Sequence, residues 1–582
     1  MHRSRSSMSL ALLAIMACSQ EAPHLAADRV NLLADGYIAA YFDAFPEEAT
    51  LAGVAAGPHD RLTDLSPAAR ARWHATQDSM LADLEDIDPT RLPETGTSAI
   101  TWAFLSDVVH NAVAFRACRM ELWNVSPTWT GWQSVMALLA SSQPVGSPEQ
   151  NDAALRRFSE LPRYLDQEMQ NLTEGLRLGY SAPKHNVESV ITQMESLLAA
   201  PVAESPFVAM APDSLPDLRA RMLELETSQL RPAFTRYRDF LRDTYLPLAR
   251  AAVGVSANPQ GDVCYRAAVR WHATVYLTPD SIRATGLAQM AEIRAQMQEI
   301  AERAFGTNDV SDALRQLRTD PRYLMRDRDE MLLVAQNAVD RAHGALAPWF
   351  GHVPDAPVVV EPVPAFSEAS APGGFYNPPS DDGSRPGVYY INLYQASTQP
   401  RAGLESTAFH ETWPGHHLQG AIALERTDLH PISRYMFLSG FGEGWGLYAE
   451  RLAGEMGLFS TDVDRMGMLS AEAHRAARLV VDAGMHALGL TRQQAIEYLL
   501  QNTALNEASA TAEIDRYIAV PGQATSYMLG NLEIRRLRIL AEERLGDRFD
   551  IRAFHDRILE DGPMPLSTLA RKIERWLDES AP

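Results

Sequence analysis

Basic and low-complexity segments are scarce in this chain of 582 residues. Its 52 Lys and Arg face 74 Asp and Glu, for a formal net charge of −22, and no basic patch offsets that balance. Nucleic acid is therefore excluded as an expected partner. No low-complexity linker divides the chain and no repeat of about 20 to 50 residues recurs in it. What the chain does have is 46% hydrophobic residues, enough for a large core.

The N-terminus has the features of an export signal. Arg3 and Arg5 precede the apolar run 8–17, which is too short to span a bilayer as a mature helix. The run ends in Ile15-Met16-Ala17-Cys18, which resembles the bacterial lipobox, in which the cysteine is lipidated and becomes the new N-terminus. An ordinary signal peptide with an incidental cysteine is the alternative. We expect a lipoprotein signal peptide at 1–17 and lipidation of Cys18.

The segment after Cys18 is short and polar, so 18–28 is expected to be a tether between the lipid and the folded body. We expect the protein to be exported and anchored by its lipid to a bacterial membrane. Ser19 is not the Asp associated with inner-membrane retention, which favours the outer membrane facing the periplasm. Only Cys118 and Cys264 would then remain, either as one disulfide or as free buried thiols.

Helical periodicity dominates the rest of the chain. After Thr278-Pro279-Asp280, where Thr can cap and Pro fits the first turn, apolar residues recur every three or four positions up to Ile300. Similar patterns run through the segments 28–110, 150–200, 216–252, 325–347 and 464–510. We predict a mainly α fold, with an N-terminal helical lobe at 29–270 and a C-terminal helical lobe at 271–582 around a cleft.

One region departs from the helical pattern. The patterns at 357–360 and 387–393 indicate short strands, with Gly- and Pro-containing turns between them. They predict a small sheet at about 356–394, next to the motif described below. The strand at 387–393 could pair its main chain with an extended peptide.

The densest group of metal-binding residue types is Phe409-His410-Glu411-Thr412-Trp413-Pro414-Gly415-His416-His417. Neutral imidazole is a preferred ligand of Zn²⁺, and a Glu beside the first His could activate water. The pattern His-Glu-x-x-His would place a second His one turn later, but that position is Pro414. The motif is therefore interrupted.

A straight helix cannot repair the interruption, because His417 would lie about 10.5 Å along the axis from His410, too far for two ligands of one ion. Pro414 lacks an amide hydrogen for the carbonyl of His410 and disfavours helical dihedrals at Trp413. A break at this point could bring either His416 or His417 back to the metal.

The third candidate ligand is Glu443, which lies 33 residues after His410, a gap long enough for a helix to return. It belongs to Ser439-Gly440-Phe441-Gly442-Glu443-Gly444-Trp445-Gly446. These glycines superficially suggest a phosphate loop, but no strand precedes them and no Lys-Ser/Thr pair follows. A surface carboxylate at a helix start is the structural alternative for Glu443.

With these motifs the chain resembles the DUF885 group of bacterial secreted proteins, which look like distant, gluzincin-like relatives of zinc peptidases with Glu as the third ligand. The resemblance is carried by His410-Glu411-Thr412-Trp413-Pro414-Gly415-His416, Glu443-Gly444-Trp445-Gly446-Leu447-Tyr448-Ala449-Glu450 and Pro521-Gly522-Gln523-Ala524-Thr525-Ser526-Tyr527. The family motif fixes the His after Pro-Gly, which favours His416 over His417.

The resemblance implies a zinc metallopeptidase of metallopeptidase-like helical architecture that acts on peptides. Zn²⁺ would be held by His410, His416 and Glu443, and Glu411 would be the general base. By analogy with related peptidases, Tyr527 would donate to the oxyanion, although a Tyr after Pro-Gly can also simply cap a core. Arg516 and Tyr517 are candidate substrate-binding residues.

Two other readings stay open, a non-catalytic, metal-stabilised binding lipoprotein and a metal hydrolase of non-peptide amides. Only the first of them would have no need of Glu411. A further polar stripe, His474, Arg478, Asp482 and His486, recurs at four-residue spacing on an otherwise apolar helix. We interpret it as a structural or supporting feature rather than a source of metal ligands.

Overall fold

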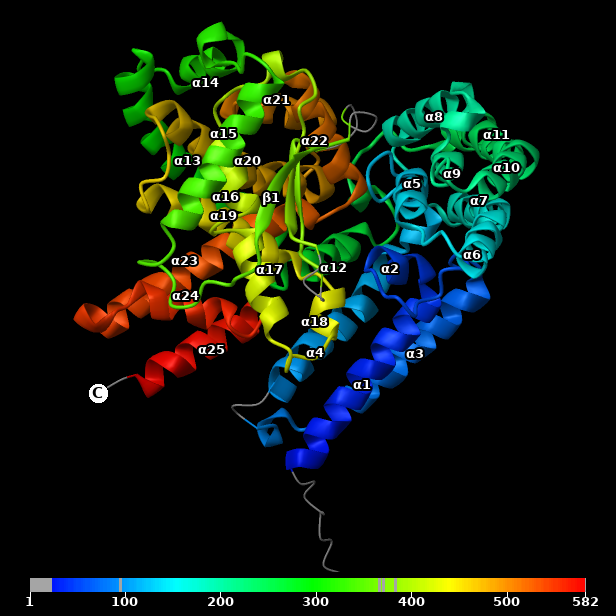
Figure 1. Cartoon of the computed structure of the whole chain (residues 1–582), viewed down its shortest axis with the longest axis horizontal. Helices are drawn as coiled ribbons and strands as arrows, with labels where there is room; N and C mark the ends of the chain where they lie inside the picture. The colour runs from blue at the N-terminus through cyan, green and yellow to red at the C-terminus, as the bar shows by residue number, and fades with distance from the viewer. Residues whose placement is uncertain (1–22, 94–96, 365–367, 369–371, 381–384, 581–582) are drawn as a thin grey trace, which may run out of the picture.

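The computed structural model describes residues 23–93, 97–364, 368, 372–380 and 385–580, and Cys18 and the signal peptide lie outside them. Helices make up most of this part, together with one small mixed sheet of three strands (Figure 1). The prediction of a mainly α fold with a small sheet is confirmed. No helix within the described ranges is long and apolar enough to cross a membrane.

The first helices of the chain lie side by side along one edge of the molecule (Figure 1). They are α1 (Pro23–Ala44), α2 (Pro46–Leu51), α3 (Pro67–Glu85) and α4 (Thr97–Phe115). Helix α1 begins inside the range 18–28 that we predicted to be a tether. Ala26 and Val30 lie one turn apart and are both buried, so the folded body begins before the predicted end of the tether.

A second group of helices surrounds a hydrophobic core of its own, built around Trp132, Phe158, Phe207 and Phe234. Its helices, in cyan and blue-green in Figure 1, are α5 (Trp132–Ser142), α6 (Pro148–Ser159), α7 (Leu161–Leu178), α8 (Lys184–Ala199), α9 (Pro206–Ala209), α10 (Pro216–Leu225) and α11 (Arg231–Asp239).

The largest core cluster draws on α1, α3 and α4 as well as on the helices that follow α11. These are α12 (Gly261–Ala273), α13 (Pro279–Ile300), α14 (Val310–Thr319), α15 (Arg328–Gly344), α16 (Leu404–Glu411), α17 (His416–Glu425), α18 (Ile432–Tyr435), α19 (Ser439–Glu455), α20 (Asp462–Ala487), α21 (Arg492–Asn502), α22 (Glu507–Ala519), α23 (Ser526–Leu545), α24 (Ile551–Leu559) and α25 (Leu566–Glu579). The lobe boundary near residue 270 stays a prediction.

Helix α13 has the N-terminal cap and the buried apolar face that its sequence predicts. The Thr278 side chain accepts a hydrogen bond from the backbone N–H of Ser281, and Pro279 occupies the first turn, as predicted. Met290, Ile293 and Met297 are buried on the face that packs along α20. Burying such a side chain contributes roughly 1.5–3 kcal/mol, so the apolar stripe fixes which face of α13 turns inward.

A disulfide joins Cys118 to Cys264 across 146 residues of sequence, which decides between the two states left open for these cysteines. It connects the short helix η2 (Arg116–Cys118), just after α4, to α12. Closing so long a loop removes entropy from the unfolded chain and so favours the packed arrangement of α4 and α12.

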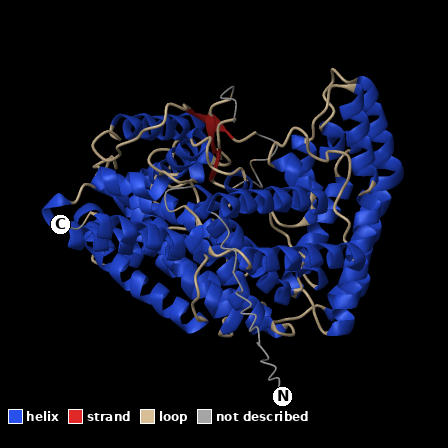
Figure 2. Ribbon diagram, turned by 90° about the horizontal axis from the view of Figure 1, so that it is seen from below, coloured by secondary structure: helices blue, strands red, loops and turns tan. Residues whose placement is uncertain are grey.

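The sheet has the strand order β1-β3-β2, from β1 (Val358–Pro362), β2 (Gly374–Asn377) and β3 (Gly387–Ile391). Figure 2 shows it in red against the helical body. Strand β3 pairs in parallel with β1 and antiparallel with β2, a strand that the sequence pattern did not predict. The suggestion that 387–393 binds a peptide by strand pairing is wrong, because β3 is central and both of its edges are already paired.

Candidate metal centre

Three helices supply the side chains of the candidate centre. His410 lies in the last turn of α16, His416 is the first residue of α17, and Glu443 lies in the first half of α19. Helix α16 ends at Glu411, and the chain passes through Pro414 and Gly415 before a new helix begins. The predicted break in the motif is therefore confirmed. Because the chain changes direction between the two helices, His416 returns toward His410 instead of continuing along one axis.

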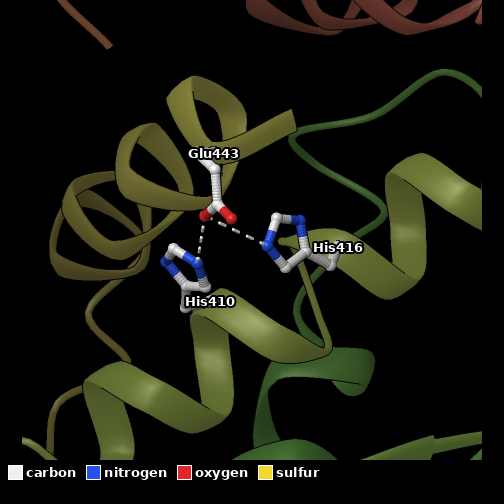
Figure 3. A group of neighbouring side chains, drawn as sticks. All are labelled: His410, His416 and Glu443. Carbon is white, nitrogen blue, oxygen red and sulfur yellow. Dashed lines mark ion pairs between the residues drawn. The ribbon is translucent and has the colours of Figure 1, made fainter. Parts of the chain in front are cut away.

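His410, His416 and Glu443 form a group that could hold a metal ion, with their ligand atoms within 4.8 Å of one another. Oε2 of Glu443 lies 3.4 Å from Nε2 of His410 and 3.7 Å from Nε2 of His416 (Figure 3). The two imidazole rings stand nearly perpendicular, with centroids 4.7 Å apart. The group matches the predicted ligand set, whose role in metal binding stays a prediction.

The residues present fit a zinc ion. Two ligands at about 2.1 Å from a tetrahedral ion are roughly 3.4 Å apart, close to both distances between the Glu443 oxygen and the imidazole nitrogens. Two histidines and a glutamate are also a donor set found at catalytic zinc sites, which keep one position open. The His410 side chain is only 4% exposed, but those of His416 and Glu443 retain 15%, so the group is reachable from one side.

Glu450 orients the His410 ring, a role that the sequence motifs alone do not reveal. Its Oε1 accepts a hydrogen bond of 2.9 Å from Nδ1 of His410, which leaves Nε2 of that ring for Glu443 or a metal. Ser406 donates to the other oxygen of Glu450, and Arg475 lies 3.6 Å from the first. The available signal was the seven-residue spacing of Glu443 and Glu450, which places both on one face of α19.

The carboxylates concentrate negative charge on this centre. Burial lowers the pKa of His410, but hydrogen bonds to Glu443 and Glu450 raise it to about 10. Burial raises the pKa of Glu443, but hydrogen bonds from His410 and His416 hold it far below its ordinary value. The centre thus favours positive charge between these side chains, which is the electrostatic environment that a bound cation requires.

Glu411 differs from the other carboxylates of the centre. In the described part of the chain its carboxylate makes no hydrogen bond or ion pair, although it interacts electrostatically with His410, His416 and Glu443. Burial is the main cause that raises its pKa above the usual value for Glu. A carboxylate that is free of partners and lies beside the ligand group is available to accept a proton.

His417 is placed away from the candidate ligands. Its Nε2–H donates to the carbonyl of Ala356 at 2.8 Å, and its Nδ1 accepts from the hydroxyl of Tyr376, on β2, at 2.9 Å. Both ring nitrogens are therefore used, and burial lowers the pKa of His417 to about 4. His417 thus links α17 to the small sheet.

Of the remaining predicted site residues, only Tyr527 interacts electrostatically with a candidate ligand in the described part of the chain, whereas Arg516 and Tyr517 pair with Glu513. Tyr527, at the start of α23, interacts electrostatically with Glu443, and the guanidinium carbon of Arg478 lies 4.2 Å from the centre of its ring. Arg516 is partly exposed and pairs with Glu513 at 2.9 Å. Tyr517 is fully buried, and its hydroxyl donates to Glu513, so that hydroxyl is not free for a substrate.

The polar stripe of α20 faces the protein interior. His474, Arg478, Asp482 and His486 are all buried and hydrogen bonded. Asp482 accepts from the hydroxyl of Tyr265 at 2.7 Å and from the backbone N–H of Gly522. The stripe therefore supports the packing of α20 against α12 and α22, in line with the structural role that we predicted for it.

The glycines near Glu443 lie within α19 and do not form a phosphate loop. They allow other elements to approach the helix closely. A side-chain carbon at Gly530 of α23 would lie 1.9 Å from the carbonyl oxygen of Gly440, so the two helices cross at backbone contact. A side-chain carbon at Gly446 would lie 2.6 Å from the His410 ring. Glycine at 446 thus makes room for the imidazole of the first candidate ligand.

Comparisons with known proteins agree with the similarity noted in the sequence. The family model described as "Bacterial protein of unknown function (DUF885)" matches residues 46–573. The solved structure of the "putative lipoprotein from Colwellia psychrerythraea" superposes with a TM-score of 0.88 at 28% identity, covering 95% of this chain and 99% of that one.

A second solved structure, of a "putative lipoprotein of unknown function from Shewanella oneidensis", has a TM-score of 0.73 at 17% identity. The match covers 93% of this chain and 98% of that one. At this identity it bears on the fold alone. A comparison with curated proteins found no match.

Substituting Gly446 tests whether the packing of His410 controls metal affinity. Gly446→Ala should weaken zinc binding by roughly 10- to 100-fold, because the added methyl group must displace the His410 ring. Zinc affinity is measured by competition with a chromophoric chelator.

Gly454→Ala on the same helix is the matched control, since a side-chain carbon there meets no atom closer than 3.7 Å. It should keep the zinc affinity of the parent protein. Equal zinc affinities for the two alanine variants would show that the room at Gly446 does not matter for the centre.

Proposed function

This chain belongs to the DUF885 family of bacterial proteins of unknown function, and we propose that it is a zinc-dependent metallohydrolase that cleaves peptides. The observation that carries the proposal is the unpaired carboxylate of Glu411 beside the group of His410, His416 and Glu443. A site that only stored a metal would have no use for a partly buried, unpaired carboxylate next to its ligands.

His410, His416 and Glu443 would hold the zinc ion, and Glu450 would orient the first of these ligands through Nδ1. A bound zinc ion lowers the pKa of a coordinated water and polarises a substrate carbonyl. Glu411 would accept the proton of the attacking water and pass it to the leaving amine, as a general base and then a general acid. Tyr527 would donate its phenolic hydrogen to the oxygen of the carbonyl under attack.

The local charges support this division of roles. Glu443 and Glu450 are both committed to imidazoles, so Glu411 is the carboxylate of the centre that is left to move protons. Tyr527 is neutral at neutral pH because burial raises its pKa, so it keeps the hydrogen that it would donate. The Arg478 guanidinium, whose carbon lies 4.2 Å from the centre of the Tyr527 ring, would stabilise negative charge that develops near this side chain.

Replacing Glu411 separates catalysis from metal binding. Glu411→Gln keeps the size of the side chain but cannot accept a proton, so it should lower kcat by roughly 10²-fold or more. Zinc content should stay that of the parent protein, because other side chains hold the ion. Cleavage of a peptide library is measured by mass spectrometry, together with zinc content.

The control is Glu533→Gln. Glu533 lies on α23 and pairs with Arg536, so its replacement should leave kcat unchanged. A Glu411→Gln variant as fast as the parent would remove Glu411 from the base role. A zinc-loaded parent that cleaves neither peptides nor other amides would support the hypothesis of a non-catalytic binding lipoprotein. One that cleaves only non-peptide amides would support the hypothesis of a metal hydrolase of non-peptide amides.

We further propose that the protein is exported and anchored by a lipid on Cys18, in the outer membrane and facing the periplasm. The sequence before Cys18 and the description of the Colwellia psychrerythraea relative as a lipoprotein support this. The apolar run 8–17 would be removed with the signal peptide, so the lipid would be the anchor.

Radiolabelled palmitate tests the anchor. The parent protein should label and sediment with outer membranes, Cys18→Ser should not label, and Ser19→Asp should label but move to the inner-membrane fraction. Labelling of Cys18→Ser would refute the assignment of Cys18.

A further inference from the structure

A partly buried cluster of charged and hydroxyl side chains adjoins Tyr527. Helix α20 contributes Arg478, and helix α22 contributes Glu513, Arg516 and Tyr517. Oε2 of Glu513 lies 3.0 Å from Arg478 and 2.9 Å from Arg516, so one carboxylate serves two guanidinium groups. Nε of Arg478 also donates to the hydroxyl of Tyr517 at 2.8 Å.

The positive charge of this cluster exceeds its negative charge. The neighbouring His474 is neutral, because burial lowers its pKa to about 3. Asp482 is hydrogen bonded to Tyr265 and Gly522 and interacts with Arg516 only electrostatically, and burial raises its pKa to about 7. Asp515 is committed to Arg492 and His185. Two guanidinium groups therefore face a single fully ionised carboxylate, an imbalance that buried charges rarely show without a partner.

One donor of the cluster has no acceptor. Arg478 is only 5% exposed, and its Nη1 is buried and makes no hydrogen bond within the described part of the chain. A buried donor without an acceptor costs about 1–3 kcal/mol, and more when it is charged. The side chain of Arg516 is 15% exposed, so the cluster also has a member that a ligand can reach. An anionic ligand would supply both the missing acceptor and the missing charge.

The cluster is close to the candidate metal centre. Tyr527 interacts electrostatically with Glu443 on one hand and with Arg478 and Arg516 on the other. The guanidinium carbon of Arg478 lies 4.2 Å from the centre of the Tyr527 ring. Successive residues of a peptide are about 3.8 Å apart, so a terminal carboxylate one or two residues beyond the bond being cut could reach the arginines.

We propose that Arg478 and Arg516 form a subsite for the C-terminal carboxylate of the substrate, so that the protein removes one or two residues from the C-terminus of peptides. This inference rests on the proposed peptidase function and specifies its substrate class. In the reaction the C–N bond breaks, the hydroxyl of water joins the acyl carbon, and its remaining proton joins the leaving nitrogen.

Binding and cleavage are compared for acetylated dipeptides and tripeptides that differ only at the C-terminus, a carboxylate or a carboxamide. The zinc-loaded Glu411→Gln variant should bind the acids at least roughly 30-fold more tightly than the amides in calorimetry, because the guanidinium pair loses its partner in the amide. The active parent should show the same preference in kcat/KM.

Arg516→Gln should reduce the preference for acids over amides about tenfold or more and leave the binding of amides unchanged, whereas Arg516→Lys should restore part of it. Arg465→Gln removes an exposed guanidinium from α20 and should change neither substrate form. Folding of Arg516→Gln is checked by circular dichroism. If this variant does not fold, the preference for acids over amides is compared between the parent and Arg516→Lys instead.

Equal binding of acids and amides by the zinc-loaded Glu411→Gln variant would overturn the subsite, as would an Arg516→Gln substitution that weakens the binding of both forms equally. Cleavage without a preference for acids would leave the peptidase function standing and remove the subsite. A preference for acids in binding, without cleavage of any peptide, would support the carboxylate subsite and contradict the peptidase function.

Discussion

The contact between the His410 imidazole and helix α19 is the interaction on which the rest of the site depends. Glu450 accepts the Nδ1 hydrogen of His410, and Gly446 leaves the room that the ring occupies. Glu443 lies on the same helix, so one packing event brings the first ligand, its supporting carboxylate and the third ligand together. The backbone contact of α19 with α23, at Gly440 and Gly530, then sets the position of Tyr527 at the start of α23.

The same packing leaves the candidate metal centre buried on one side and partly exposed to solvent on the other. His410 and Glu450 are enclosed by α16, α19 and α20, while His416 and Glu443 keep some exposure. The buried side is rich in paired charges, such as Arg475 with Glu450 and Arg451 with Glu472, which hold the helices in register. On the other side Glu411 makes no hydrogen bond or ion pair within the described residues, which suits the proton transfer that we propose for it.

The sequence predicted the parts of this account that depend on local chemistry. Helix α13, the break at Pro414 and the small sheet follow from capping residues, a missing amide hydrogen and β-branched runs. It could not predict that β3 is the central strand, because β2 has only 4 residues and is too short for a clear alternating pattern. The role of Glu450 and the unpaired guanidinium of Arg478 also depend on helices that meet only in the folded chain. The start of α1 inside the expected tether was missed because two buried residues, Ala26 and Val30, are too few for a clear period.

Zinc binding by His410, His416 and Glu443 is tested by replacing each of two adjacent histidines, His416 and His417. His417 uses both ring nitrogens in hydrogen bonds, whereas Nε2 of His416 faces Glu443. Zinc per chain, measured by plasma mass spectrometry after equilibrium dialysis, should be close to one for the parent and for His417→Ala. It should fall to near zero for His416→Ala. Full zinc content in His416→Ala, with loss in His417→Ala, would show that His417 and not His416 binds the ion.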